Sequence, residues 1–218
     1  MGNALDDSAG SSSVREARRV GVVLFDGFEL LDVCGPLELF GKLPEMFSIE
    51  VLAKSAGPVT SAQGPALVAT AAFEDATTPE IVLVPGGIGT RMLVDDSAFI
   101  DWLSDWAAEA EFVTSVCTGA GLLGAAGLLD GYRATTNKRA FEWPRSQAPQ
   151  VEWVAEARWV QDRNRWTSSG VAAGMDMTLA LIAHLHGAEV AQELADAVEL
   201  EWHTDSTWDP FASLNGLT

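Results

Sequence analysis

A cysteine stands at the junction of a predicted strand and a predicted helix, where its thiol would act as a nucleophile. Phe112, Val113 and Val116 indicate a short buried strand, and Thr118–Ala126, directly after Cys117, is a run of mostly small residues typical of a tightly packed helix. A nucleophile on such a turn is held in a strained backbone at the sheet edge, and the helix N-terminus is expected to favour the thiolate. A buried structural cysteine is the alternative, but the strand–turn–helix context favours the nucleophile.

Asp32 is the candidate partner of this thiol. It lies in a predicted loop, Phe28–Asp32, before a helix that Gly35 and Pro36 are expected to begin. Aspartate is also among the best helix caps, so a capping and a catalytic role both stay open. An ionised carboxylate would raise the thiol pKa, whereas a protonated one would donate a hydrogen bond to the thiolate and share one proton with it. The second arrangement suits a general acid that protonates the substrate while the sulfur attacks.

Backbone N–H groups near the cysteine are candidates for binding an anion or the substrate. Gly86 and Gly87 follow the apolar run Ile81–Val84 and permit close backbone approach, and the N–H of Thr118 is expected to point at the reacting centre. An ordinary turn at a strand end is the other interpretation of the Pro-Gly-Gly sequence. We predict an oxyanion or substrate-binding role for these three residues.

The sequence places no histidine near Cys117, and no metal-ligand motif is present in it. The three histidines are His184, His186 and His203, and the first two lie two residues apart on a predicted helix, so they do not face one site together. The cysteines Cys34 and Cys117 and these histidines match no metal-ligand spacing. We therefore expect no metal site.

The elements that must position these residues alternate between strands and helices. Predicted strands cover Arg19–Phe25, Phe47–Ala53, Ile81–Val84, Phe112–Val116, Arg133–Thr136, Val151–Val154, Ala157–Gln161 and Trp166–Ser168, with a hairpin turn at Asp162–Arg165. Predicted helices cover Gly35–Phe40, Ser97–Ala110 (capped by Asp96 or Ser97), Thr118–Ala126, Gly174–Leu185 and Glu189–Leu200. The pattern predicts an α/β fold, a three-layer sandwich with a mainly parallel sheet, whose ligands bind beyond the carboxyl ends of the strands.

Composition narrows the class of protein. The chain has 218 residues, with 31 acidic against 13 basic side chains and a net charge of −18. This charge disfavours nucleic-acid binding and leaves open a high-salt habitat or a generally acidic proteome. With no signal peptide, membrane span or disulfide framework, we expect a cytoplasmic protein without a membrane partner. We predict a disordered tail over residues 1–17 and a single α/β domain over 18–218.

Four motifs resemble those of the ThiJ/PfpI superfamily, which has the class I glutamine amidotransferase-like fold, and within it those of the isocyanide hydratases. The motifs are Phe25–Pro36 (FDGFELLDVCGP), Val84–Gly87 (VPGG), Val113–Gly119 (VTSVCTG) with Leu123–Leu129 (LGAAGLL), and Arg133–Thr136 (RATT). The resemblance runs from about Val20 to Phe211. It implies a flavodoxin-like homodimer that acts on a small molecule without a cofactor. It also implies that Cys117 attacks the terminal isocyanide carbon, that Asp32 transfers protons, and that water releases an N-substituted formamide.

The chain departs from the superfamily pattern at several points. Family members often have Thr-Thr-His-Trp where this chain has Thr135-Thr136-Asn137-Lys138. Asn137 cannot act as a base, which weakens the glyoxalase, amidase and protease-like alternatives that depend on a histidine near the cysteine. Cys34 stands where relatives often carry threonine and is either a second thiol near the site or a packing residue.

A redox or small-molecule sensor is the competing class of function. The same fold forms the N-terminal part of some AraC-type regulators, and Cys117 would then be an oxidisable thiol. The length of the chain to Thr218 leaves no room for a helix-turn-helix portion, and its negative charge repels DNA. We therefore expect a hydro-lyase, with a free-standing sensor as the alternative.

Overall fold

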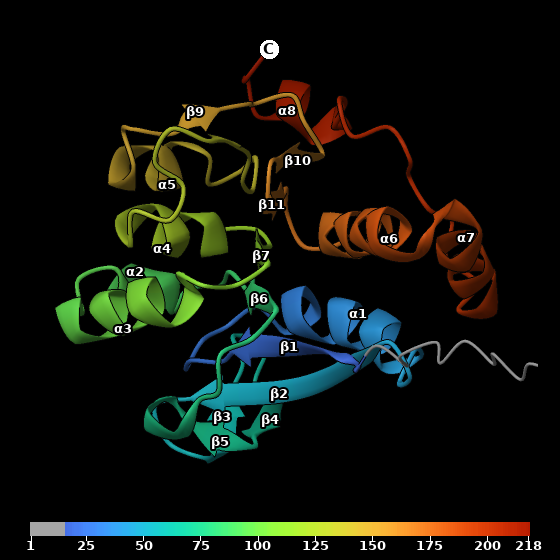
Figure 1. Ribbon diagram of the computed structural model, residues 1–218. Coiled ribbons are helices and arrows are strands. Elements are labelled where there is room, and N and C mark those ends of the chain that lie inside the picture. Colours follow the sequence, from blue (N-terminus) through green and yellow to red (C-terminus); the bar gives the residue numbers. More distant parts are fainter. Residues whose placement is uncertain (1–15) are drawn as a thin grey trace, which may run out of the picture.

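A seven-stranded sheet in the order β10-β11-β7-β6-β1-β2-β5 forms the centre of the protein (Figure 1), whose computed structural model describes residues 16–218. The strands are β1 (Arg18–Val23), β2 (Phe47–Ala53), β5 (Ala71–Ala72), β6 (Ile81–Val84), β7 (Phe112–Ser115), β10 (Trp159–Asp162) and β11 (Arg165–Ser168). The disordered tail predicted for residues 1–17 lies, apart from its last two residues, outside the described part of the chain.

The sheet is parallel except at β10, which pairs antiparallel with β11. Counting only β1, β2, β6, β7 and β11 in chain order, the spatial order is 2-1-3-4-5, which is the flavodoxin-like order. The chain reverses direction across the sheet between β1 and β6, and ligands in such folds bind at this switch point. The predicted α/β fold with a mainly parallel sheet is confirmed.

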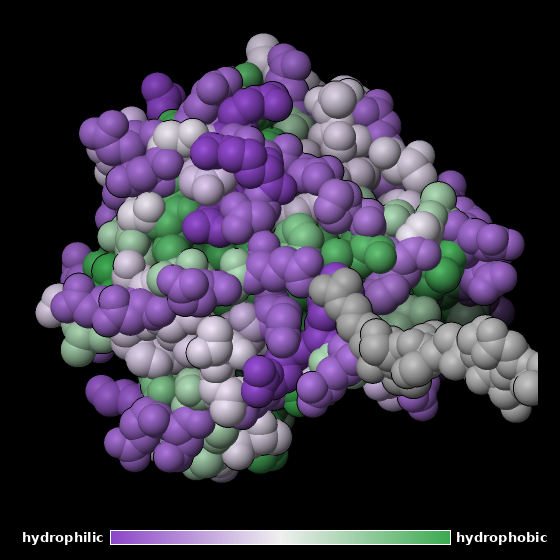
Figure 2. Space-filling model, viewed as in Figure 1, coloured by the Kyte–Doolittle hydropathy of each residue, from purple (hydrophilic) through white to green (hydrophobic). Residues whose placement is uncertain are grey.

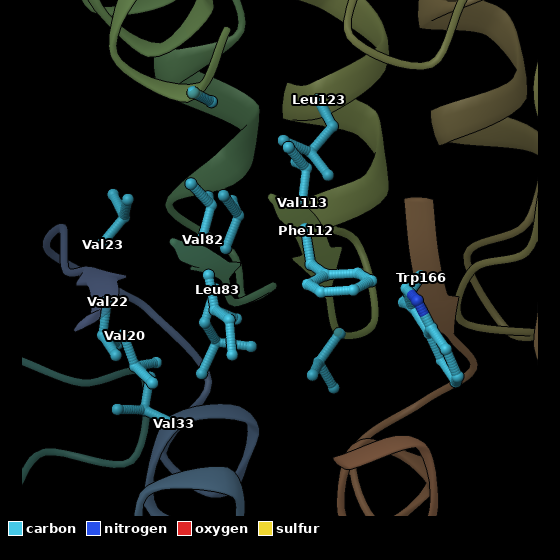
Figure 3. Packing of buried hydrophobic residues seen from close by; sticks show 14 of the residues in the cluster. Val20, Val22, Val23, Val33, Val82, Leu83, Phe112, Val113, Leu123 and Trp166 are labelled. Carbon is cyan, nitrogen blue, oxygen red and sulfur yellow. The ribbon is translucent and has the colours of Figure 1, made fainter. Parts of the chain in front are cut away.

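The central strands form because their side chains are apolar on both faces. All four residues of β6 are at most 1% exposed, and β1 is buried from Val20 to Val23. Parallel strands covered by helices on both faces require such continuous apolar runs. Figure 3 shows Val82, Leu83 and Val113 from neighbouring strands packed into one core.

Helices cover both faces of the sheet (Figure 1). One group contains α1 (Leu30–Gly41), α6 (Ala173–His186) and α7 (Ala188–Ala197), and the other contains α2 (Thr90–Leu93), α3 (Ser97–Ala107), α4 (Gly119–Ala125) and α5 (Glu142–Gln147). The predicted cap of α3 is confirmed, because the Asp96 side chain accepts a hydrogen bond from the N–H of Phe99. The hairpin predicted near Asp162–Arg165 is also present, as β10 and β11.

The predicted start of the first helix was wrong. The helix α1 begins at Leu30, five residues before Gly35, and Pro36 lies inside it. Glu29 precedes α1 without a capping side chain, and Asp32 lies in the first turn, so Asp32 is not the cap. The apolar residues around Asp32 are compatible with this earlier start, because Val33 is buried and Leu30 half-buried, while Leu31 is exposed.

The remaining differences between the predicted and the observed elements concern short strands and helices. The predicted strand Arg133–Thr136 is paired only at β8 (Arg133–Ala134), against β9 (Glu152–Trp153). The sequence pattern did not predict β3 (Gly57–Thr60), β4 (Ala66–Ala69), β5, η1 (Phe73–Asp75), α2, α5 or α8 (Pro210–Leu214). These elements span two to six residues, which is too short for a clear hydrophobic period.

The visible surface is largely hydrophilic. In Figure 2, hydrophilic residues cover most of the visible face, and smaller hydrophobic areas lie between them. Within residues 16–218, no helix has both the length and the apolarity that a membrane span needs.

Candidate active site

Cys117 lies on the turn between β7 and α4 with a backbone φ of 57°. This left-handed conformation is uncommon outside glycine and marks local strain. Two hydrogen bonds hold the turn: the N–H of Cys117 donates to the Ser169 carbonyl at 3.1 Å, and the Thr136 hydroxyl donates to the Cys117 carbonyl at 2.7 Å. The predicted strained elbow is therefore present, and the residue is 7% exposed.

Glycines around the elbow allow this close packing. A Cβ atom at Gly86 would lie 2.6 Å from the backbone nitrogen of Thr118 and 2.8 Å from the Cβ of Cys117. A Cβ at Gly119 would lie 2.8 Å from the Pro85 carbonyl oxygen. Real Cβ atoms do not approach other atoms so closely, so the loop after β6 and the elbow after β7 touch only because both carry glycine.

Asp32 is fully buried beside this elbow. Its Oδ2 accepts a hydrogen bond of 2.8 Å from the N–H of Gly86, and its Oδ1 is buried without a hydrogen-bond partner among the described residues. Burial raises the pKa of the Asp32 carboxyl from 3.8 to about 8, the Gly86 bond partly offsets this rise, and the nearby charge of Glu29 adds to it. At neutral pH this carboxyl holds a proton.

The thiol of Cys117 also holds its proton. Burial raises its pKa, and the charge of Asp32 raises it further, while hydrogen bonds from the Thr118 backbone and side chain and from Asn137 lower it. The Thr118 backbone at the helix start does lower the thiol pKa, as expected, but desolvation is the larger effect, so the net pKa is raised and the thiolate is not favoured. Since the carboxyl and the thiol affect one another's pKa, they titrate as a pair.

The N–H groups of both predicted glycines are already engaged. Gly86 donates to Asp32, and Gly87 donates to the Thr118 hydroxyl oxygen at 3.1 Å. Gly87 has a φ of +121°, and a Cβ there would lie 2.5 Å from the nitrogen of Glu29, so only glycine fits. The structure thus brings Asp32, Gly86, Gly87 and Thr118 together at the elbow. The oxyanion role predicted for Gly86, Gly87 and Thr118 stays a prediction.

Asn137 is a site residue whose positive role the sequence did not reveal. Its side-chain oxygen accepts a hydrogen bond from the N–H of Ala140 at 3.0 Å, which directs the amide nitrogen the other way. That side chain forms a hydrogen bond with Cys117 that lowers the thiol pKa. Asn137 directly follows Thr136, whose hydroxyl donates to the Cys117 carbonyl. This position in the sequence is the signal that could have identified Asn137 as a site residue.

Arg91 and Trp143 also lie close to the elbow and were not predicted. The guanidinium carbon of Arg91, on α2, sits 3.4 Å from the ring centroid of Trp143, on α5. The charge of Arg91 would interact with the thiolate form of Cys117, and its Nη1 donates to the Thr90 hydroxyl at 3.4 Å. The Thr90 hydroxyl in turn lies 3.3 Å from that of Thr118.

His184 and His186 lie at the other end of the sheet from Cys117. His184 packs against Phe112 and His186 against Phe47, and both phenylalanines are the first residues of their strands. Cys117 lies two residues beyond the end of β7, so neither of these two histidines reaches it. Among residues 16–218, no group of three or more histidine, cysteine or acidic side chains is placed to hold a metal ion.

Two surface hollows, of about 550 and 310 Å³, lie beside α5, and neither is lined by Cys117. The first is lined by Phe141, Arg145, Val151 and Trp153 among others, and the second by residues that include Lys138 and Trp143.

Comparisons with known proteins agree with this geometry. The model of the DJ-1/PfpI family matches residues 18–184. The isonitrile hydratase of Pseudomonas putida is 39% identical over 177 residues, which cover 81% of this chain and 75% of that enzyme. The HTH-type transcriptional regulator GbdR of Pseudomonas aeruginosa is 29% identical over 84% of this chain, and the match spans only 50% of the regulator. A solved structure of a ThiJ/PfpI family protein from Pseudomonas syringae has a TM-score of 0.77 at 31% identity, covering 99% of this chain and 91% of that one.

Proposed function

We propose that this chain, which belongs to the DJ-1/PfpI family, hydrates isocyanides to N-substituted formamides. The observation that carries the proposal is the pair formed by Cys117, on a strained elbow, and Asp32, a buried carboxyl that retains a proton at neutral pH. The similarity to an isonitrile hydratase over four fifths of the chain supports the same reaction.

The proposed reaction begins with addition of the Cys117 sulfur to the terminal carbon of R–N≡C. The thiol proton reaches that carbon through Asp32, so the first product is a thioformimidate, R–N=CH–S–Cys117. Water then adds to the same carbon, one of its protons goes to the nitrogen, and the C–S bond breaks. The sulfur recovers a proton and R–NH–CHO leaves. One water is consumed, and no electrons are gained or lost.

The burial of the site fits this substrate. The isocyano group is linear and carries its reactive carbon at the tip, so it can reach a sulfur that is only 7% exposed. The carbon must accept both a nucleophile and a proton, and the Asp32–Cys117 pair offers both on neighbouring atoms. A buried acid with a pKa near 8 is well matched to proton transfer at neutral pH.

Asn137 supports the sulfur in this scheme. Because the N–H of Ala140 holds its oxygen, its amide can donate a hydrogen bond but offers no base. We propose that this donor stabilises negative charge on the sulfur as the C–S bond forms and breaks. The glyoxalase and amidase alternatives need a base next to the cysteine, and this donor does not provide one.

A redox sensor needs an accessible, low-pKa thiol. Burial and the Asp32 charge raise the pKa of Cys117, and the residue is nearly inaccessible, so the site is poorly suited to oxidation. The similarity to transcriptional regulators favours a sensor, and the match to GbdR spans half of that regulator.

The test follows the ultraviolet absorbance of an aromatic isocyanide with reduced wild type, Cys117→Ala and Asp32→Asn. Turnover by wild type, formamide as the product, and loss of turnover in both variants are expected. An absence of turnover by folded, reduced wild type across aromatic, alkyl and carboxylate-bearing isocyanides would refute the proposal. Slow oxidation of Cys117 by peroxide would argue independently against the sensor.

A further inference from the structure

Most arginines that the structure describes pair with a carboxylate, and Arg91, like Arg139 and Arg165, does not. Six arginines form ion pairs: Arg18 with Glu111, Arg19 with Glu80, Arg133 with Glu152, Arg145 with Glu142, Arg158 with Asp176, and Arg163 with Asp162. Within residues 16–218, Arg91 has no carboxylate partner, although acidic residues outnumber basic ones more than twofold across the chain. Its charge is therefore available to an anion from outside.

The guanidinium of Arg91 is held in place rather than free in solvent. It stacks flat on the indole of Trp143, at 3.4 Å from the ring centroid. The indole is itself seated on α4, because a Cβ at Gly121 would lie 2.7 Å from its Cζ3. The elements involved, α2, α4 and α5, lie on the same side of the sheet (Figure 1).

Most of the hydrogen-bonding capacity of Arg91 is unused. Its Nη1 donates to the Thr90 hydroxyl at 3.4 Å, and its other N–H groups donate to none of the residues that the structure describes. A guanidinium has five N–H donors in a planar fork that matches the geometry of a carboxylate. A stacked guanidinium offers this fork along its edge.

This fork lies next to the nucleophile. The Thr90 hydroxyl connects Arg91 to the Thr118 hydroxyl, so two hydrogen-bond lengths separate the guanidinium from the residue that follows Cys117. The Arg91 charge would interact with Cys117 only in its thiolate form. Because the thiol keeps its proton, the resting sulfur does not neutralise the guanidinium.

We propose that Arg91 binds a carboxylate carried on the R group of the substrate, so that the enzyme prefers isocyanides that bear a carboxylate. This inference rests on the proposed function and names its substrate class. The arginine provides a contact at the far end of the substrate, and the elbow acts on the isocyano carbon.

The decisive experiment compares isocyanoacetate with its neutral methyl ester. Wild type is expected to show a kcat/KM about 10- to 100-fold higher for isocyanoacetate, as charge-assisted hydrogen bonds imply. Arg91→Gln should remove this preference, mainly through KM, and leave the ester within about threefold of wild type. Arg145→Gln, at an exposed paired arginine on α5, is the matched control and should behave as wild type.

Equal kcat/KM for the two substrates in wild type would overturn the inference, and so would an equal loss on both substrates in Arg91→Gln. A separate binding measurement distinguishes this failure from failure of the proposed function. N-formylglycine should raise the melting temperature of wild type but not of Arg91→Gln, whether or not any isocyanide is turned over. If N-formylglycine binds both proteins equally or neither, Arg91 is not the anion site.

Discussion

Replacing Asp32 with asparagine should abolish the proposed isocyanide hydration and at the same time stabilise the folded protein. Asparagine has the same shape and retains an oxygen that can accept the hydrogen bond from Gly86. It also places an N–H donor where Oδ1 is now buried without a partner. The variant keeps the packing of α1 while it removes the group that transfers protons and the cost of burying an acid.

The expected gain follows from the pKa of Asp32. Its folded-state pKa of about 8 lies above its ordinary value of 3.8, so the native state retains a proton that the unfolded chain releases. The wild-type protein therefore loses stability as the pH rises from about 4 to about 8, by up to about 1.4 kcal/mol per pH unit. This sets an upper bound of about 6 kcal/mol, and we expect at least about 2 kcal/mol at pH 8, or roughly 4–8 °C in melting temperature.

The assay is thermal and urea unfolding of wild type and Asp32→Asn at several pH values between 4.5 and 8.5. The advantage of the variant should grow steadily with pH and level off above about 8. Asp101→Asn, which removes the same charge from an exposed position on α3, controls for net charge and should show no such growth. An Asp32→Asn advantage that does not change with pH, or a variant that is less stable than wild type at pH 8, would refute the reasoning.

Three further changes test the rest of the site. Gly86→Ala would place a Cβ 2.6 Å from the Thr118 nitrogen. It should lower activity about 100-fold and the free energy of unfolding by about 1–3 kcal/mol. The control Gly41→Ala, whose Cβ would make only an ordinary contact at 3.8 Å, should leave activity unchanged. Asn137→Ala removes a donor to the thiol and should shift the pH dependence of iodoacetamide alkylation to higher pH; an unshifted profile would remove Asn137 from the site. Lys138 is buried, and burial lowers its pKa to about 8. Wild type should therefore gain stability relative to Lys138→Met as the pH rises from about 8 to about 10.5. Stability curves that stay parallel over this range would contradict the prediction.

Much of the fold followed from the sequence because the central strands are buried on both faces. Continuous apolar runs such as Ile81–Val84 leave little choice of structure, and the alternation of strands and helices predicts the parallel sheet. The resemblance to the ThiJ/PfpI superfamily, which rested on short motifs, is confirmed by the match over residues 18–184. The start of α1 was misplaced because Gly35 and Pro36 resemble a helix start even when they lie inside a helix.

The residues of the site were only partly predictable. Cys117 and Asp32 stand at predicted strand and helix ends, where parallel-sheet topology brings side chains together. Three further site residues were missed: Arg91 on α2, Asn137 in the loop after β8, and Trp143 on α5. These segments have no clear hydrophobic period. Arg91 and Trp143 are 52 positions apart, so no local sequence pattern predicts that the cation stacks on the ring.

The balance between desolvation and the helix N-terminus bears directly on what this elbow can do. A thiol whose pKa is lowered by a helix would rest as a thiolate, and an exposed thiolate is open to oxidation. Here burial raises the pKa of both groups, so both keep their protons at neutral pH, and in the proposed reaction Cys117 acts as the nucleophile and Asp32 as the acid. An isocyano carbon needs both, because the atom that the sulfur attacks is also the atom that must be protonated. The same desolvation that makes Asp32 costly to the fold therefore prepares it to deliver that proton, and the loss of activity and gain of stability in Asp32→Asn should appear together.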